Sequence, residues 1–130
     1  MEMCRRVADY VASMPNKERF VLATHMYGMD WPAGGGPAHT AAALEYADVL
    51  ALIAAHRATP VLDPVSDAWT FSYTDAGGVS HEVWYPDAAT IARRVTLARE
   101  RGLGIGFWRL GEEDQRVWDD PQIASGTAWP

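Results

Sequence analysis

Between Gly102 and Asp114 the chain reads GLGIGFWRLGEED and changes from almost wholly apolar to strongly charged within a few residues. The apolar part, Leu103 to Trp108, is too short for a helix and too apolar for a strand with one face in water. It predicts a strand covered on both faces, as in a parallel sheet. In α/β folds, and in barrels especially, ligands bind at the carboxyl end of such strands. We therefore expect a site where this strand ends.

A second apolar run, Phe20 to Ala23, predicts another buried strand. Its carboxyl end is followed by side chains with binding chemistry: His25, Tyr27, Asp30 and Trp31. A strand–helix–strand connection between the two runs is parallel and right-handed, so both carboxyl ends lie on the same side of the sheet. We therefore expect residues 27–31 beside residues 108–114. Two strands are too few for a sheet covered on both faces, which indicates a piece of something larger.

Three other segments show the apolar spacing of amphipathic helices. The first runs from Glu2 to Met14, and the second runs from an N-cap at Thr40 to about His56. The third runs from Asp87, as its N-cap, to Arg101, and a glycine follows its end. The third helix leads directly into the strand that starts at Leu103.

After the second of these helices the apolar period changes to two, which is typical of strands. Residues 69–74 and 79–85 alternate in this way around a turn at residues 75–78, and they predict a β-hairpin, with a short strand at residues 59–62 before it. The hairpin aromatics should fill the core of this region, with room for one of them to reach the site: Trp69, Phe71, Tyr73, Trp84 and Tyr85. Residues 32–37 are expected to be a loop and residues 115–130 a tail.

Composition narrows the possible functions. The 130 residues are 48% hydrophobic, which is enough to bury the core of one domain. The formal net charge of −6 argues against nucleic acid and membranes as partners, because nucleic acid and anionic membranes attract clustered Lys and Arg. No apolar run is long enough to span a bilayer, and no signal peptide is expected. The 6 tryptophans suit either a dense core or a surface that stacks flat rings such as sugars.

Three separated motifs resemble the C-terminal portion of glycoside hydrolase family 18: VLATHMYGMDW, YTDAGGVSHEVWYPDAATI, and GLGIGFWRLGEED followed by VW. The resemblance covers roughly residues 3–118 and is closest to the chitinase-like bacterial branch with spore-germination-type N-acetylglucosaminidases. It implies an α/β fold, a partial (β/α)8 TIM barrel with the last two barrel strands and their helices, which carries a small α+β insertion domain. Residues 1–31 and 87–118 would be the barrel part, residues 32–86 the insertion subdomain and residues 119–130 a tail.

The family also implies a chemistry. Its members act on glycans with β-1,4-linked N-acetylglucosamine, of the chitin or peptidoglycan type, and carry a DxxDxDxE motif whose Glu is the general acid. None of the 17 Asp and Glu residues fits that spacing. The resemblance therefore implies that this chain supplies part of the sugar-binding cleft without the catalytic acid and is inactive alone. A separate N-terminal barrel portion would then be a partner beside the oligosaccharide or polysaccharide.

The resemblance also implies which residues contact the sugar. Trp108 matches a tryptophan that floors a sugar subsite, and Tyr27 matches a tyrosine that lines the cleft, with Trp31 and Asp30 in the same loop. The alternative for Trp108 is a core position under the barrel mouth. For Trp31 and Asp30 the alternative is simple packing of the loop.

Two further groups of side chains are expected to have no catalytic role. The acidic residues 112–114 should form a solvated loop or pair with Arg109 or Arg116. No metal and no cofactor are expected, because no ligand-like spacing is shared by His25, His39, His56 and His81.

Three hypotheses about function stay open. The chain is the C-terminal portion of a glycoside hydrolase, a non-catalytic carbohydrate-binding remnant, or a truncated product without a function of its own. The third hypothesis predicts self-association, through unpaired strand edges and uncovered helix faces. Members of the family are often secreted or associated with the cell wall or the spore, and no feature of this sequence decides the location.

Overall fold

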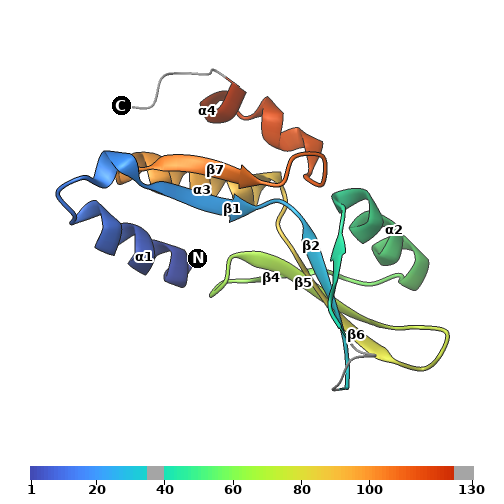
Figure 1. Cartoon of the computed structure of the whole chain (residues 1–130). Helices are drawn as coiled ribbons and strands as arrows, with labels where there is room; N and C mark the ends of the chain where they lie inside the picture. The colour runs from blue at the N-terminus through green and yellow to red at the C-terminus, as the bar shows by residue number, and fades with distance from the viewer. Residues whose placement is uncertain (35–39, 125–130) are drawn as a thin grey trace.

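A parallel pair of strands, β1 (Val21–His25) and β7 (Gly104–Trp108), forms the smaller of two sheets in the computed structural model (Figure 1). The structure describes residues 1–34 and 40–124. In the pair, Val21 lies opposite Gly104 and His25 opposite Trp108, so the predicted parallel arrangement is confirmed. Among the described residues, no helix has the length and apolar character needed to cross a membrane.

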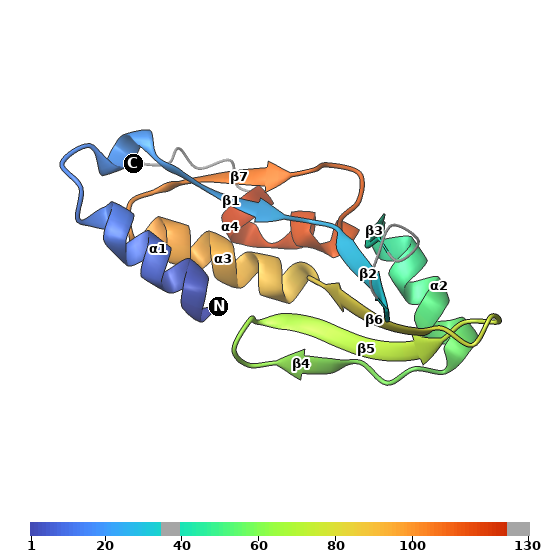
Figure 2. The ribbon, with the colours of Figure 1, turned by 60° about the horizontal axis from the view of Figure 1, so that its bottom comes forward.

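Helix α3 (Ala88–Glu100) leads into β7 and packs along one face of this sheet (Figure 2). Ile91 and Val95 of α3 are fully buried or nearly so, and Ile105 and Phe107 of β7 pack against the same cluster. Helix α1 (Glu2–Ala12) lies beside α3 and shares a second cluster, which consists of Ala8, Leu97, Ala98 and Leu103. The helices therefore bury the side of the sheet that faces α3.

The opposite face of the β1–β7 sheet is open. Val21 is 60% exposed and Ala23 is exposed as well, and they lie opposite Gly104 and Gly106. The expectation that residues 103–108 form a strand covered on both faces is therefore wrong for the described part of the chain. The reason is that helices pack on one side only, so that only the side chains directed toward α3 lose their contact with water.

The second sheet has five strands in the order β3-β2-β6-β5-β4, with antiparallel neighbours throughout. They are β2 (Gly28–Pro32), β3 (Ala42–Leu44), β4 (Val61–Asp63), β5 (Ala68–Thr74) and β6 (Ser80–Tyr85). The predicted hairpin is confirmed as β5 and β6. Helix α2 (Tyr46–His56) covers one face, over a core of Val49, Phe71, Val83 and Tyr85. The sheet begins ahead of residue 32, and the division of the chain into a barrel part and an insertion subdomain stays a prediction.

The segment before α2 differs from the prediction. Thr40 is not an N-cap, because residues 42–44 pair with β2 and the helix starts at Tyr46, after Glu45 as its N-cap. Pairing with β2 here outweighs the helix propensity of three consecutive alanines. Of the predicted loop at residues 32–37, residues 35–37 lie outside the described residues.

The predicted tail is largely ordered into helices. Residues 115–124 form the 3₁₀-helix η3 (Gln115–Asp119) and the short helix α4 (Pro121–Ala124), both of which contact α3. Val117 is fully buried in the cluster with Ile91 and Val95, although most residues of η3 around it are polar. This burial depends on contacts with α3 that no local period reveals. The remaining residues of the predicted tail, 125–130, lie outside the described part of the chain.

The start and the end of α3 agree with the prediction. Asp87 forms a capping box with Thr90: the Thr90 N–H donates to Asp87 Oδ1 over 2.8 Å, and the Asp87 N–H donates to Thr90 Oγ1 over 2.9 Å. Gly102, with φ +66°, adopts the left-handed conformation that glycine favours after a helix. Both ends of the helix that joins β6 to β7 are thus encoded locally.

We predict that Gly28→Ala destabilises the second sheet, because β2 passes very close to α2 at this position. A Cβ atom on residue 28 would lie 2.9 Å from Val49 Cγ2 and 3.2 Å from Tyr85 Cβ. Overpacking of this kind should lower the free energy of unfolding by about 1–3 kcal/mol, measured by urea denaturation followed by circular dichroism.

The matched control is Gly77→Ala in the β5–β6 turn. Its Cβ atom would lie 3.4 Å from the nearest atom, Asp75 Oδ1, which is ordinary contact. This variant should change the free energy of unfolding by less than about 0.5 kcal/mol. Equal losses in the two variants would contradict a specific close approach at Gly28.

Candidate functional site

The carboxyl ends of β1 and β7 lie side by side, and the chain enters the second sheet directly from β1 (Figure 2). The backbone N–H of Met26 donates to the carbonyl oxygen of Trp108 over 2.7 Å, which extends the pairing beyond His25. Met26 itself is buried under this junction. The carboxyl ends of the two strands therefore meet at residues 25–26 and 108. The finer expectation, that residues 27–31 lie beside residues 108–114, stays a prediction.

Trp108 is the last residue of β7 and is 66% exposed. Its peptide bond to Arg109 is cis, and Leu110, two residues later, is also largely exposed. In this chain the Trp108 indole is therefore no part of a buried core. It offers a large apolar surface at the strand end, where ligands bind in α/β proteins.

Tyr27 and Trp31 follow β1 at the same end. Tyr27 is half-buried, with its ring centroid 5.6 Å from that of His25 and the two rings inclined at 59°. Trp31, in β2, is 51% exposed. Side chains alternate between the two faces of a strand, so Trp31 shares its face with Met29, which lies opposite Trp84 of β6.

Asp30 points to the other face of β2 and is only 8% exposed. Its carboxylate accepts hydrogen bonds from the Tyr73 hydroxyl over 2.6 Å and contacts His81 Nδ1 at 2.8 Å. Burial, together with the hydrogen bond to Asp30, raises the pKa of the Tyr73 hydroxyl. The rings of Tyr73 and His81 are stacked, with their centroids 4.6 Å apart. Asp30 and Trp31 are therefore neighbours in sequence with different surroundings.

Trp84 was expected in the core with the other hairpin aromatics, but it lies outside the core under α2. Of the five hairpin aromatics, Phe71 and Tyr85 belong to the core under α2, and Trp69 and Tyr73 pack against it. Trp84 lies on the opposite face, beside Met29, and is half-buried. Its position between Val83 and Tyr85, which are both buried, is the alternation signal that places its side chain on the other face.

The acidic residues after β7 are buried, so the expectation of a solvated loop is wrong. Glu112, Glu113 and Asp114 are 9%, 7% and 2% exposed. Glu113 accepts hydrogen bonds from the Gly111 N–H, Gln115 Nε2 and Trp118 Nε1 over 2.6, 2.9 and 3.0 Å. Burial alone would raise the pKa of Glu113, but the hydrogen bonds, that from Trp118 foremost, hold it below its usual value of 4.5.

The expected pairing of the acidic residues with Arg109 and Arg116 is confirmed. Arg109 Nη2 donates to Glu112 Oε1 over 2.6 Å, and Arg116 Nη2 donates to Asp114 Oδ2 over 2.7 Å. Asp114 also contacts an element that is distant in sequence. Its Oδ2 atom accepts a second hydrogen bond, from the Ala88 N–H at the start of α3, over 3.0 Å. These carboxylates act as structural acceptors that hold the loop together.

The same loop contacts the second sheet through Tyr46, the first residue of α2. The Tyr46 N–H donates to the Glu112 carbonyl oxygen over 2.9 Å, and Arg116 Nη2 donates to the Tyr46 hydroxyl over 3.0 Å. Although burial by itself would raise the pKa of Asp114, its hydrogen bonds from Arg116 and Ala88 lower it. The loop after β7 therefore joins α2, α3 and η3 around buried, ionised carboxylates.

No group of three or more His, Cys, Asp or Glu side chains within residues 1–34 and 40–124 is arranged to hold a metal ion. His25 lies against Tyr27, and His81 contacts Asp30, so the two histidines belong to different parts of the molecule. His39 lies outside the described residues. The residues at and after the strand ends include two exposed aromatic rings, those of Trp31 and Trp108.

We predict that the chain loses stability as the pH falls below about 4.5. Glu113 and Asp114 have a lower pKa in the fold than their ordinary values of 4.5 and 3.8, so the unfolded chain takes up their protons first. Their contribution to stability is present above pH 4.5 and is lost as the pH falls through the folded pKa values. Glu113→Gln should lower the free energy of unfolding at pH 7 by about 1–3 kcal/mol and make its acid dependence shallower.

Glu18→Gln is the control for this prediction, because Glu18 is an exposed carboxylate in the short 3₁₀-helix Lys17–Arg19. It should leave both the stability at pH 7 and the acid dependence unchanged. Urea denaturation between pH 3 and pH 7 measures both quantities. A Glu113→Gln variant with the acid profile of the unsubstituted chain would contradict a structural role for the charged form.

Comparison with known proteins identifies relatives of the chain. No family model matches it. The cortical fragment-lytic enzyme of Bacillus subtilis (strain 168) is 32% identical over 119 residues, which cover 88% of this chain and 27% of that protein. The chain thus spans about a quarter of the length of this relative.

Solved structures share the fold. The spore cortex-lytic enzyme SleL of Bacillus cereus matches with a TM-score of 0.82 and 26% identity, over 96% of this chain and 29% of that chain. A chitinase from Chromobacterium violaceum ATCC 12472 matches with a TM-score of 0.74 and 31% identity, over 95% and 37%. A family GH18 chitinase from Cycas revoluta, solved as a complex with allosamidin, matches with a TM-score of 0.62 and 25% identity, over 89% and 35%. These are the relatives that the three sequence motifs predict.

Proposed function

Because the chain is homologous to spore cortex-lytic enzymes and to family GH18 chitinases, we propose that it is the C-terminal portion of a glycoside hydrolase family 18 barrel. In this proposal it builds one wall of a cleft for glycans with β-1,4-linked N-acetylglucosamine, and the catalytic acid lies on a strand outside this chain. The observation that carries the proposal is the exposed Trp108 indole at the carboxyl end of a parallel strand pair.

The open face of the β1–β7 sheet supports a place in a barrel. A (β/α)8 barrel has helices on the outside of its sheet and side chains of the other strands on the inside. In this chain α3 covers one face, and Val21, Ala23 and His25 on the other face are exposed. The glycines of β7 make room for the Val21 side chain, because a Cβ atom on Gly104 or Gly106 would lie only 3.1 Å from it. An inner barrel face accounts for this asymmetry.

The aromatic side chains support a sugar as the ligand. A flat indole suits the C–H face of a pyranose ring, and Trp108 and Trp31 both have half or more of their surface in contact with water. Tyr27 precedes Trp31 in the same segment and has a hydroxyl that can donate to or accept from a sugar hydroxyl or acetamido group. Trp84 shares the face of Trp31 and joins this wall in the proposal.

Asp30 has a different part in the proposal. Its carboxylate is engaged by Tyr73 and His81, so it fixes the position of β2 and thereby of Trp31. A side chain that is 8% exposed and already bonded has little surface left for a sugar. Asp30 therefore acts behind the wall of the cleft.

The absence of a suitable acid in the sequence supports the noncatalytic role. Hydrolysis of a glycosidic bond needs protonation of the leaving oxygen, and none of the 17 Asp and Glu residues fits the DxxDxDxE spacing. The acids nearest to Trp108 in sequence, residues 112–114, are held by Arg109, Trp118 and Arg116. A separate N-terminal barrel portion would supply the acid and complete the cleft.

A chimera tests this function. The matched part of the Chromobacterium violaceum chitinase, which is 37% of that chain, would be replaced by residues 1–124. We expect the chimera to hydrolyse an N-acetylglucosamine oligosaccharide, and the 130-residue chain alone to hydrolyse none. In the chimera, Trp108→Ala should lower kcat/KM by about tenfold or more, because an anchoring tryptophan at the centre of a binding surface is lost.

Leu50→Ala is the control, because Leu50 is an exposed apolar side chain (47%) that lies on α2 and on neither β2 nor β7, the strands of the proposed wall. It should leave kcat/KM within about twofold of that of the chimera, which is an energetically neutral change. Hydrolysis by the isolated chain would overturn the placement of the acid outside it. A folded chimera in which Trp108→Ala and Leu50→Ala behave alike would overturn the role of Trp108.

A further inference from the structure

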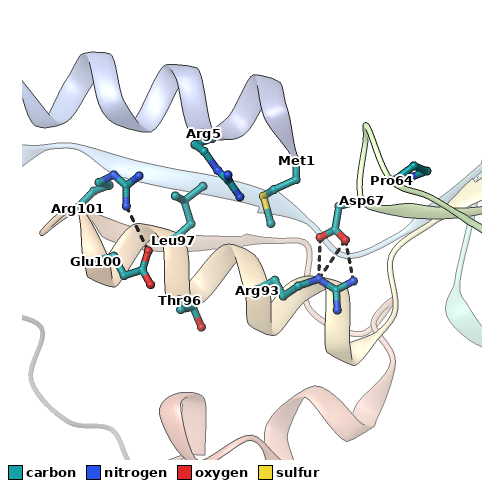
Figure 3. A pocket seen from close by; sticks show the side chains of 9 residues that line it. All are labelled: Met1, Arg5, Pro64, Asp67, Arg93, Thr96, Leu97, Glu100 and Arg101. Carbon is teal, nitrogen blue, oxygen red and sulfur yellow. Dashed lines mark hydrogen bonds and ion pairs between the residues drawn. The ribbon is translucent and has the colours of Figure 1, made fainter.

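A groove with a volume of about 540 Å³ lies between α1 and α3, beside the turn that carries Pro64 and Asp67 (Figure 3). Its walls combine guanidinium groups with apolar side chains, among them Leu97, which is 5% exposed. None of the residues that form the proposed sugar wall lines this groove. It is therefore a separate feature of the surface.

The two carboxylates that line the groove are already paired with arginine. Arg93 Nε lies 3.0 Å from both oxygens of Asp67, and Arg93 Nη2 lies 2.7 Å from Oδ1. Arg101 Nη1 lies 3.2 Å from Glu100 Oε2, and Arg101 Nε lies 2.7 Å from Oδ1 of Asp9, outside the groove. The acids of the groove thus have their charges balanced locally.

Arg5 is the third guanidinium of the groove and has no such partner. Figure 3 shows its side chain reaching from α1 into the space above Leu97, with no interaction drawn to it. Within residues 1–34 and 40–124 no hydrogen bond or ion pair involves the Arg5 guanidinium. The side chains of the lining therefore carry one positive charge in excess, in a chain whose formal net charge is −6.

We infer that this groove binds a small carboxylate ligand with an apolar body. The Arg5 guanidinium presents paired N–H donors that match a carboxylate, and charge-assisted hydrogen bonds of this kind are the strong ones. The apolar body of the ligand lies against Leu97 and the side chains of Met1 and Pro64. Inorganic phosphate has no apolar part, so the lining favours an organic acid.

The test is a titration of the uniformly ¹⁵N-labelled chain with hexanoate, followed by amide chemical shifts. We expect saturable shifts at Arg5, Leu97 and Arg101, and binding that weakens as salt is added. Hexanol, which lacks the charge, and inorganic phosphate, which lacks the apolar body, should bind more weakly than hexanoate. Arg5→Gln should weaken hexanoate binding by about tenfold, the loss expected for one charge-assisted contact.

Arg6→Gln is the matched control, because Arg6 is the next residue of α1 and lines a different hollow with Met3, Val7 and Tyr10. It should leave the affinity for hexanoate within about twofold, as expected for a surface change away from the site. Thermal melts establish that both variants fold like the parent chain. No saturable shifts, equal weakening in the two variants, or equal binding of hexanol or phosphate would each overturn the inference.

Discussion

The parallel pairing of β1 with β7 is the constraint on which the other elements depend. Parallel strands cannot be joined by a tight turn, so a long connection must leave the end of β1 and return to the start of β7. The chain uses α3 as the return, and α3 buries the same face of both strands. The whole second sheet is contained in this connection, between Gly28 and Tyr85. Its strands leave from, and come back to, the end of the pair that carries Trp108.

The loop after β7 fixes how the second sheet meets this pair. The loop accepts hydrogen bonds from the helices that pack on the two sheets. The Asp114 carboxylate accepts from the first turn of α3, and the backbone carbonyl of Glu112 accepts from the first residue of α2. Arg116 connects Asp114 with the Tyr46 hydroxyl. Buried carboxylates are costly unless each lone pair finds a donor, and here the donors come from different elements. The loop therefore holds a defined geometry beside the exposed Trp108.

The elements that could be predicted from the sequence are those whose signals are local. The α3 cap at Asp87, the left-handed glycine after the helix and the alternation of the hairpin are all written in neighbouring residues. The differences arise where a distant partner decides. β3 forms at residues 42–44 because β2 lies beside it, and Val117 is buried because α3 lies beneath it. The charge of residues 112–114 predicted a solvated loop, but these residues are buried because donors from other parts of the chain bond to them.

The candidate site follows the same division. The strand ends and the exposed aromatics at Trp108 and Trp31 could be placed from the sequence, because apolar runs followed by polar residues mark strand ends. The different surroundings of Asp30 and Trp31 could not be predicted, because they depend on Tyr73 and His81, which are distant in sequence.

Asp30 and Trp31 also differ in burial. The Asp30 carboxylate is bonded to two partners and little exposed, so it stabilises the second sheet. An exposed tryptophan lacks the favourable free energy that burial of its large apolar surface would provide. Trp108 and Trp31 are exposed in a chain that buries Phe71 and Tyr85 efficiently. Exposure of these two rings therefore supports the proposal that they contact a ligand, and it argues against a part in the core of this chain.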